Sequence, residues 1–422
     1  MSGSGTVTRP RGDATFHAPA VVRRAWRERA RVWWREIDKV LLLLIVLLML
    51  MGTVSVMAAS PATAEQLSTA EVRLDEFMFL KRHVVFQVAG LGLLIGLSFL
   101  TREEARRVGI IVGAGMLFLL FLVPLIGAEK NGARRWLEVG MSLQPSEFLK
   151  PGFAIILAWV LSWRLRDPAL PVLSFATGLV GVIAALLMLQ PNLGETILFA
   201  GIWFVMLLLA GVSVQRISLL VGGGLTLLTA AYFLYDNARN RIDSFLGGGT
   251  AFDQVDLAYR TLLAGGWDGS GLWLGIRKMN LPEAHTDYIF SVIGEEFGLL
   301  MCGVVILLYL AIVARVLVRL ADEENLFVLL AGAGLVTQIG GQAFINIMVN
   351  LKMFPSTGMT LPLISYGGSS TLAVSFTIGL LLAITRRNPF LERDSGGLKS
   401  AIGWPKNERP ESARHEGKEE RA

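Results

Sequence analysis

The amino-acid sequence predicts an all-α polytopic membrane protein of about ten transmembrane helices, with a large extracytoplasmic loop between helices 7 and 8. Of its 422 residues 53% are hydrophobic, and its mean hydropathy is +0.55. Only 17% are charged, against about 25% in ordinary soluble domains. The apolar residues also gather in runs of about 20, the length that a helix needs to cross the hydrocarbon core of a bilayer. These observations exclude a chain of two or three soluble domains.

The expected spans are apolar runs bounded by charged and turn-forming residues. They lie at residues 40–59, 84–100, 108–126, 147–163, 170–189, 194–211, 216–235, 288–314, 326–350 and 362–385. This even number of spans places both ends of the chain on one side of the membrane. We expect a basic N-terminal segment over 1–38, a transmembrane domain over 39–388, and a charged, disordered tail over 389–422.

The N-terminal segment is basic and rich in tryptophan. The first apolar run after it is too long for the apolar region of a signal peptide, so we interpret it as a retained signal anchor. Small residues near Ala58 leave cleavage as the alternative. We expect the basic stretch to lie along an anionic cytoplasmic surface, with a disordered tail as the alternative for residues 1–19. The residues concerned are Arg23, Arg24, Trp26, Arg27, Arg29, Arg31, Trp33, Trp34 and Arg35.

Lysine and arginine in short loops set the orientation of a membrane protein, because they are retained on the cytoplasmic side. The basic residues of the loops on the side of the N-terminus are Arg102, Arg106, Arg107, Arg164, Arg166, Arg216, Arg315, Arg319, Arg386 and Arg387. That side is therefore predicted to be cytoplasmic, in the bacterial inner membrane. The lone cysteine, Cys302, lies inside an apolar run and is interpreted as a packing residue, and the four His have no metal-ligand spacing.

Four connections then face outward: 60–83, 127–146, 236–287 and 351–361. The third is long, and a loop of that length is usually functional or disordered. Trp267, Leu272 and Trp273 within it argue against plain disorder. This face also carries unusual positive charge, at Arg134, Arg135, Arg239, Arg241, Arg260, Arg277, Lys278 and Lys352. Either these residues bind an anion such as a pyrophosphate, or they serve solubility and pair with aspartates.

Two polar motifs lie on the outer side, in the connection between the third and the fourth span. In Asn131–Leu137, Arg134, Arg135 and Trp136 suit a site at the level of the lipid headgroups, or an interfacial anchor. In Gln144–Pro151, Ser146 is a candidate N-cap. Glu147 and Lys150 are three residues apart, so they share a helix face and can neutralise each other. That pair is either structural or the polar wall of a substrate cavity.

The stretch Leu281–Gly298 places His285, Asp287, Glu295 and Glu296 at the mouth of an apolar helix. Placing carboxylates at the edge of the apolar layer costs free energy, so their presence there indicates a function. Asp287 is either a general base or a helix cap, and His285 would assist by hydrogen bonding or transient protonation. Consecutive residues of a helix point 100° apart. We therefore expect Glu295 and Glu296 to face different partners, one in the polar interior and the other Lys150, an arginine or a proton.

The last polar motif, Pro355–Ser370, opens the final span. Its prolines and glycines predict backbone that is not regular helix, which a membrane tolerates only inside protein or along a wet cavity. On the preceding span, Gln342 and Asn346 are four residues apart on one face. We expect them to form hydrogen bonds between helices.

Taken in order, NGARRW, QPSE-x-x-K, LPEAHTDYIF-x-x-x-EEFG and GMTLPLISYGGSS resemble the motifs of the bacterial SEDS family (shape, elongation, division and sporulation). The similarity covers about residues 36–388. The resemblance implies a peptidoglycan glycosyltransferase that polymerises lipid II, with a class B penicillin-binding protein and other division proteins as partners and with no nucleic acid. It also implies that the aspartate of the HTD motif, here Asp287, is catalytic.

Within that family the sequence is more similar to the division branch, FtsW, than to the elongation branch, RodA. Two positions depart from the division pattern: Thr357 replaces a lysine, and Asn192 replaces an aspartate. The candidate substrate-binding residues are Arg134, Arg135, Trp136, Glu147, Lys150, Arg239, Arg241, Gln254, Arg277, Lys278, His285, Thr286, Glu295, Ser365, Tyr366, Gly367, Gly368, Ser369 and Ser370. The sequence demands no cofactor, although a divalent cation such as Mg²⁺ can accompany the pyrophosphate.

The resulting hypothesis has Asp287 deprotonating the 4-hydroxyl of an acceptor sugar, which displaces undecaprenyl pyrophosphate from the donor with inversion. A lipid II flippase is the rival function of another class, since Lys150, Glu295 and Glu296 lie within apolar spans. A structural scaffold for division proteins is a third. The polar motifs gather on the outer side, whereas a flippase needs polar groups through the whole bilayer, so the sequence favours the polymerase.

Overall fold

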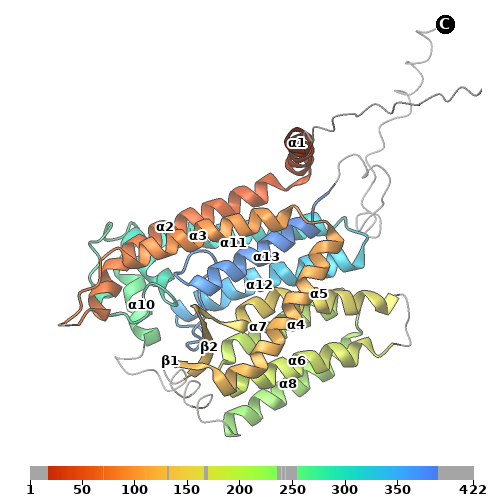
Figure 1. Cartoon of the computed structure of the whole chain (residues 1–422). Helices are drawn as coiled ribbons and strands as arrows, with labels where there is room; N and C mark the ends of the chain where they lie inside the picture. Colours follow the sequence, from red (N-terminus) through yellow and green to blue (C-terminus); the bar gives the residue numbers. More distant parts are fainter. Residues whose placement is uncertain are drawn as a thin grey trace, which may run out of the picture.

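A computed structural model describes residues 18–69, 71–130, 133–165, 170–234, 239, 243 and 254–387. Residues 1–17 and the predicted tail over 389–422 lie outside this set. Each of the ten predicted spans is present as a helix, and these helices lie side by side as a bundle (Figure 1). They are α2 (Lys39–Leu67), α3 (Met78–Ser98), α4 (Arg102–Ile126), α5 (Pro145–Ser162), α6 (Val172–Leu189), α7 (Leu193–Leu209), α8 (Val214–Leu234), α11 (Ile289–Leu320), α12 (Leu326–Asn350) and α13 (Gly368–Ile384).

Length and composition agree with a membrane bundle. Within the described residues, α2, α3, α4, α6, α11 and α12 are long and apolar enough to cross a bilayer, and α7 and α13 are shorter apolar helices. Further elements lie outside these spans: the helices α1 (Ala18–Glu36) and α10 (Gln254–Ala264), and the 3-10 turns η1 (Trp163–Leu165) and η2 (Arg277–Asn280). The chain is therefore a multi-pass membrane protein, as predicted.

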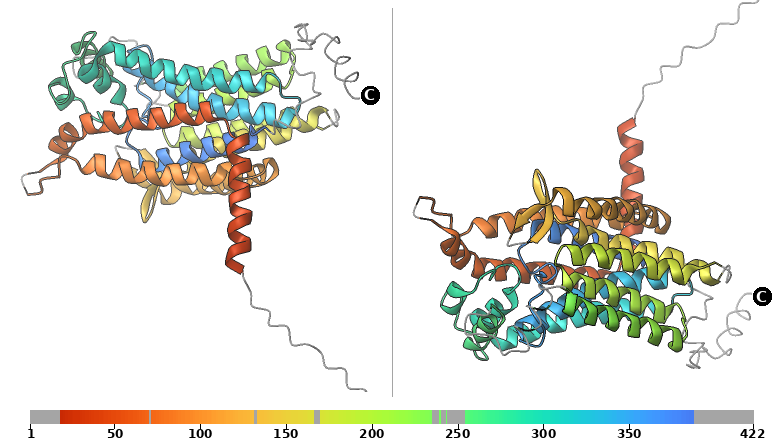
Figure 2. Two further views of the ribbon diagram at one scale, coloured as in Figure 1. Left: turned by 90° about the horizontal axis from the view of Figure 1, so that it is seen from above. Right: turned by 90° about the horizontal axis from the view of Figure 1, so that it is seen from below.

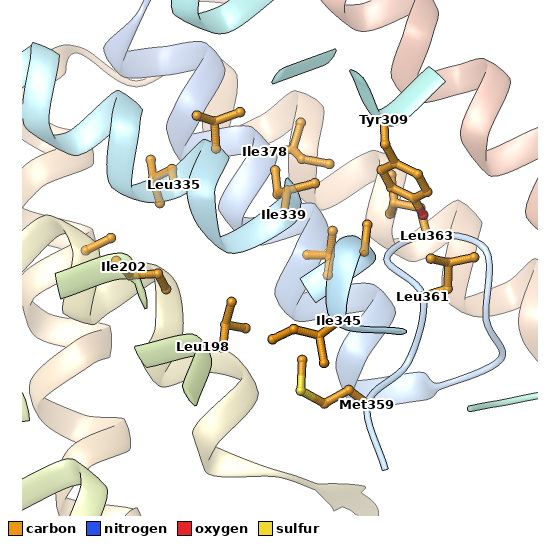
Figure 3. Packing of buried hydrophobic residues seen from close by; sticks show 14 of the residues in the cluster. Leu198, Ile202, Tyr309, Leu335, Ile339, Ile345, Met359, Leu361, Leu363 and Ile378 are labelled. Carbon is orange, nitrogen blue, oxygen red and sulfur yellow. The ribbon is translucent and has the colours of Figure 1, made fainter. Parts of the chain in front are cut away.

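The central helix is α12, which packs against α5, α7, α11 and α13. In its most apolar stretch 72% of the residues are buried, against 22% for the peripheral α4. Figure 3 shows side chains from α7, α11, α12 and α13 meeting around it, together with the segment 359–363 that precedes α13. The Tyr309 hydroxyl donates to the Pro362 carbonyl at 2.6 Å and so ties this segment to α11. The core thus fixes the polar segment before α13.

The last span begins later than predicted, at Gly368 rather than near residue 362. The residues before it are irregular, and Leu363 has a positive φ of 63°. The expectation of non-helical backbone in Pro355–Ser370 is confirmed up to that point. Ser146 is not the N-cap of α5: Gln144 occupies that position and Pro145 begins the helix, because proline is favoured in the first helical turn, where no amide hydrogen is needed.

A small antiparallel sheet between α4 and α5 has no counterpart in the sequence-based prediction. It consists of β1 (Ala128–Lys130), β2 (Ala133–Val139) and β3 (Met141–Leu143) in the order β1-β2-β3. Gly140, with a φ of 72°, supplies the tight turn between β2 and β3. Successive strand residues point to opposite faces, so Arg135 and Leu137 are buried whereas Arg134 and Glu138 are exposed.

The loop arginines of the N-terminal side meet at one end of the bundle. Arg315 Nε and Arg319 Nη1 lie 2.8 Å and 3.0 Å from the same Asp38 oxygen. Arg102 donates to the Arg386 carbonyl at 3.1 Å. The sheet and α10 lie at the other end (Figure 1). The structure therefore confirms that these arginines share one side, apart from the polar motifs.

Candidate active site

Asp287 lies in the short connection before α11, and its neighbours are tied to the segment before α13. The His285 carbonyl accepts a hydrogen bond from the Tyr366 amide at 2.9 Å. The Thr286 carbonyl accepts one from the Ser365 hydroxyl at 2.5 Å. Two motifs far apart in the sequence, HTD and SYGGSS, thus form one unit. The Ser365 hydroxyl and the Tyr366 amide thus join the segment before α13 to the two residues that precede Asp287.

Two asparagines of α12 secure Asp287 itself. Its carbonyl accepts hydrogen bonds from Asn346 Nδ2 at 2.8 Å and Asn350 Nδ2 at 3.2 Å. Asn350 Oδ1 accepts from the Ser291 hydroxyl at 2.7 Å, in the first turn of α11. Asn346 also donates to the Met359 carbonyl at 2.7 Å. Each carbonyl from His285 to Asp287 therefore has a partner from another element, and the Asp287 side chain projects from a backbone with little freedom.

This arrangement predicts that Asn350→Ala slows the reaction more than it weakens substrate binding. The variant loses the bonds to Asp287 and Ser291, and a small misplacement of a catalytic group can cost about a hundredfold in rate. We expect kcat for glycan polymerisation to fall by about tenfold to a hundredfold with KM nearly unchanged. Gln338→Leu is the matched control, since Gln338 is also buried on α12 but bonds Thr377. Equal losses in the two variants would contradict a positioning role.

Arg135 brings a positive charge close to Asp287. Its guanidinium donates to the Gln190 carbonyl at 3.1 Å and to the Pro191 carbonyl, in the turn between α6 and α7. A Cβ placed on Gly358 would lie 3.4 Å from Arg135 Nη1 and 3.8 Å from Asp287 Oδ2. Gly358 has a φ of 71°, which only glycine adopts without strain. The carboxylate and the guanidinium therefore border the same backbone position.

The other predicted basic ligands are spread over the outer end. Arg134 is exposed and pairs with Glu129 at 3.4 Å, on the face of β2 opposite Arg135. Arg239 pairs with Asp243 at 3.5 Å beyond α8, and Arg277 is exposed at η2. Trp136 is half-buried in β2, Gln254 is exposed at the start of α10, and Arg241 lies outside the described residues. Arg135 borders the surroundings of Asp287 at Gly358, and the ligand roles of the other residues stay predictions.

His285 is buried among aromatic rings and near a hydroxyl. Its ring centroid lies 4.6 Å from that of Phe79 and 5.3 Å from that of Tyr366. Thr63 Oγ1 lies 3.2 Å from His285 Nδ1. Burial lowers the pKa of His285 to about 4. The imidazole is therefore neutral at pH 7, which favours the predicted support by hydrogen bonding over transient protonation.

The low pKa of His285 predicts a pH-dependent stability. In the unfolded chain a histidine titrates near pH 6.5, so between pH 6.5 and pH 4 the unfolded chain binds more protons and stability falls as pH falls. We expect His285 to contribute a loss of about 2 kcal/mol between pH 7 and pH 5, and His285→Gln is expected to remove that contribution. Thermal unfolding in detergent over that pH range measures it. An identical pH dependence in the variant would show that other groups are responsible.

Glu147 and Lys150 form the predicted pair, inside a larger buried network. Lys150 Nζ lies 2.7 Å from Glu147 Oε1, 3.4 Å from Glu195 Oε1 and 3.1 Å from Gln342 Oε1. Asn192 Nδ2 donates to Glu195 Oε2 at 2.9 Å. The ammonium group thus meets an acceptor on each of α5, α7 and α12. The interhelical role predicted for Gln342 is confirmed.

The same network reaches the segment before α13. Gln342 Nε2 donates to the Thr360 carbonyl at 3.0 Å, and the Thr360 and Ser370 hydroxyls lie 2.7 Å apart. Ser370 in turn lies 3.4 Å from Glu147 Oε2. Ser369 is buried in the first turn of α13, and Gly368 allows the Phe86 ring to approach, since a Cβ there would come 2.7 Å from it. The Gly367 backbone is extended. The network therefore braces the backbone that contacts the HTD motif.

Glu295 and Glu296 have a different arrangement from the predicted one. Glu295 accepts hydrogen bonds from the Arg277 and Lys278 amides at 2.6 Å and 2.9 Å. Glu296 accepts from the Trp273 amide and forms an ion pair with Lys278 Nζ. The two carboxylates therefore bind different groups, as expected, but all of these groups belong to the loop that wraps around α11 where Gly298 interrupts the helix. Lys278 is the partner of Glu296, in place of Lys150 or a free proton.

The Lys278 ammonium group is committed to this structure. It donates to the Ala58 carbonyl at 2.9 Å as well as to Glu296, and the residue is buried. Glycines make the wrap possible: a Cβ on Gly275 would come 2.7 Å from Glu295 Cδ. The predicted contact between Lys278 and a pyrophosphate stays a prediction. In the structure the Lys278 ammonium group joins α11 to α2 through Glu296 and the Ala58 carbonyl.

Comparison with known proteins agrees with this arrangement. The model of the FtsW/RodA/SpoVE family, described as cell cycle proteins, matches residues 38–389. A probable peptidoglycan glycosyltransferase FtsW from Caulobacter vibrioides is 37% identical over 360 residues, 85% of this chain and 91% of the relative. Proteins with the same name from Halorhodospira halophila and Geobacter metallireducens are each 35% identical, over 83% of this chain and 90% and 95% of theirs.

Solved structures give the same result. One chain, from a peptidoglycan synthase complex that coordinates polymerization and crosslinking, aligns with a TM-score of 0.67 at 30% identity, over 83% of this chain and 97% of that chain. The rod shape determining protein RodA of Thermus thermophilus aligns with a TM-score of 0.61 at 28% identity over the same shares. Shared sequence over most of both chains and a shared fold leave one conclusion: this chain belongs to the FtsW/RodA/SpoVE family, the SEDS family that its motifs resemble.

Proposed function

We propose that this protein is a peptidoglycan glycosyltransferase of the FtsW type, which polymerises lipid II into β-1,4-linked glycan strands for septal wall synthesis. The observation that carries the proposal is the placement of Asp287, whose backbone is hydrogen-bonded to α12 and whose carboxylate borders Gly358, as the Arg135 guanidinium does. The relatives named as FtsW glycosyltransferases support the same chemistry. A carboxylate at the outer end of a membrane bundle can reach the headgroup of a lipid-linked substrate in the outer leaflet, so the headgroup does not have to enter the bilayer.

In the proposed reaction Asp287 acts as a general base. An Asp287 oxygen accepts the proton of the 4-hydroxyl on the acceptor's N-acetylglucosamine. The oxygen of this 4-hydroxyl attacks the anomeric carbon of the donor's N-acetylmuramic acid. The bond from this carbon to the pyrophosphate breaks, and undecaprenyl pyrophosphate leaves with the electron pair. The α-linked donor gives a β-linked product by inversion, and a positioned base contributes about 10²–10⁴ in rate.

The departing pyrophosphate needs positive charge near the reacting carbon. Arg135 is the best-placed candidate, since its guanidinium is fixed by two carbonyls beside Gly358. Arg134 and Arg277 are exposed at the same end and suit the outer part of the pyrophosphate. The described residues contain no cluster of three His, Cys, Asp or Glu side chains suited to a metal. A Mg²⁺ ion bound to the pyrophosphate would be part of the substrate.

The proposed location is the bacterial inner membrane with both termini in the cytoplasm. The clustering of Arg315 and Arg319 at the end opposite Asp287 supports this orientation, because basic loops are retained inside. The proposed partner is a class B penicillin-binding protein, which would crosslink the new strands, together with other division proteins. The structural similarity to a chain of a peptidoglycan synthase complex that polymerizes and crosslinks supports the penicillin-binding protein as a partner.

Fluorescent lipid II tests the activity directly. The purified chain is reconstituted in vesicles with its class B partner and given labelled lipid II, and products are separated by gel electrophoresis. Glycan polymer is the expected result, and vesicles with the partner alone are the control. Translocation of the label without polymer would overturn the proposal in favour of a flippase.

A further inference from the structure

The helix α1 has no part in the proposed reaction and is not one of the spanning helices. It runs across the direction of the spanning helices at the end where α2 begins (Figures 1 and 2). The spanning helices define the direction through the membrane. A helix that crosses them at one end therefore lies along the membrane surface, as amphipathic interfacial helices do.

Trp33 fixes the depth of α1. Its ring stacks on Phe99, with centroids 4.7 Å apart, and its Nε1 donates to the Ser98 hydroxyl at 2.9 Å. Ser98 is the last residue of α3, so the contact joins α1 to the level at which α3 leaves the apolar layer. Tryptophan favours this level, where its ring is in apolar surroundings and its N–H can bond.

The described part of α1 presents positive charge and apolar area together. Arg27, Arg31 and Arg35 are exposed and lie four residues apart on one face. The Trp34 side chain is 50% exposed, with Lys39 Nζ 5.2 Å from its ring centroid. Water alone is a poor partner for such a surface, whereas a bilayer interface with negative headgroups satisfies both of its parts.

We propose that α1 is a binding site for anionic phospholipids of the leaflet at this end of the protein. The arginines contact the lipid phosphates, which a guanidinium binds with two parallel hydrogen bonds. Trp34 lies at the boundary of the acyl chains. This attraction is electrostatic, so it depends on the charge of the lipid and weakens at high salt. It would fix the orientation of the N-terminal segment independently of glycosyl transfer.

A spin label on the full-length protein tests the proposal. Cys302 is the lone cysteine and is buried, so an exposed Ala30→Cys can be labelled selectively. The protein is placed in nanodiscs of phosphatidylcholine, or of phosphatidylcholine and phosphatidylglycerol in equal parts. Collisions with a neutral nickel complex in the water are then compared with collisions with oxygen in the bilayer. With phosphatidylglycerol we expect nickel collisions to fall by about threefold and oxygen collisions to rise.

Charge variants identify the cause. The triple change Arg27→Glu, Arg31→Glu, Arg35→Glu is expected to abolish the lipid dependence, and the matched change of all three to Lys is expected to retain it. A label at Glu71→Cys, at the other end of the bundle, is the reference site. An unchanged melting temperature checks folding. Equal nickel access in both bilayers, as for a helix that projects into water or docks on a protein, would overturn the proposal. A glutamate variant that kept the lipid dependence would do the same.

Discussion

Replacing Asp287 by Asn is expected to lower the rate of lipid II polymerisation by about 10²–10⁴-fold. The amide keeps the size of the carboxylate and removes its capacity to accept the proton of the acceptor hydroxyl. The folded structure is expected to survive, because Asn346 and Asn350 bond the backbone carbonyl of residue 287 rather than its side chain. The measurement is the initial rate of polymer formation by the reconstituted protein with its class B partner.

Two further variants separate catalysis from binding and from general damage. Asp287→Glu keeps a carboxylate but moves it by one methylene, so we expect an intermediate rate with a nearly unchanged KM. Asp268→Asn removes an exposed carboxylate in the same outer loop and is expected to retain the wild-type rate. If Asp287→Asn polymerised lipid II as fast as the wild type, Asp287 could not be the base. The proposed polymerase activity would then need another catalytic group.

The sequence is sufficient to predict where the spanning helices lie and which side chains meet within one turn of a helix. Apolar runs of membrane length locate every expected helix, because a bilayer leaves few alternatives for such a segment. Glu147 and Lys150 could be paired from their spacing of three, since helix geometry brings such residues together. The cost of carboxylates at the mouth of an apolar helix made His285–Glu296 a candidate site, and the resemblance to the SEDS motifs then singled out Asp287.

What the sequence could not provide are the contacts between distant segments. Arg134 and Arg135 are adjacent in sequence, but a strand turns them to opposite faces, and the prediction of a connecting loop over 127–146 does not anticipate that. Asn350 meets Asp287 and Glu195 meets Lys150 only because α12 and α7 pack where they do. The available signal for Glu195 was a carboxylate inside an apolar run. Chemistry makes such residues candidates, and only packing identifies their partners.

The second large effect is expected at Lys150, the centre of the buried network. Its ammonium group has three N–H donors, and Glu147, Glu195 and Gln342 supply an acceptor for each. Lys150→Ala leaves two buried carboxylates facing each other without a cation. Breaking a buried ion pair typically costs about 3–5 kcal/mol, and this network also braces the segment that bonds the HTD motif. We expect a lower melting temperature together with a loss of polymerisation.

A compensated variant, which also removes the two carboxylates, distinguishes the effect of unpaired buried charge from the effect of lost side-chain volume at residue 150. Combining Lys150→Met with Glu147→Gln and Glu195→Gln removes all three charges at nearly constant volume, so most of the lost stability is expected to return.

Lys81→Ala is the exposed control: Lys81 pairs with Asp75, but the lysine side chain is 69% exposed, and such a pair contributes at most about 1 kcal/mol. Thermal unfolding in detergent compares the variants. If Lys150→Ala cost no more than Lys81→Ala, the network would not be what joins α5, α7 and α12 beneath the active site. If the compensated variant regained stability without activity, at least one of the three charged groups would be needed for the reaction itself, as the sequence-based prediction of a polar cavity wall implies.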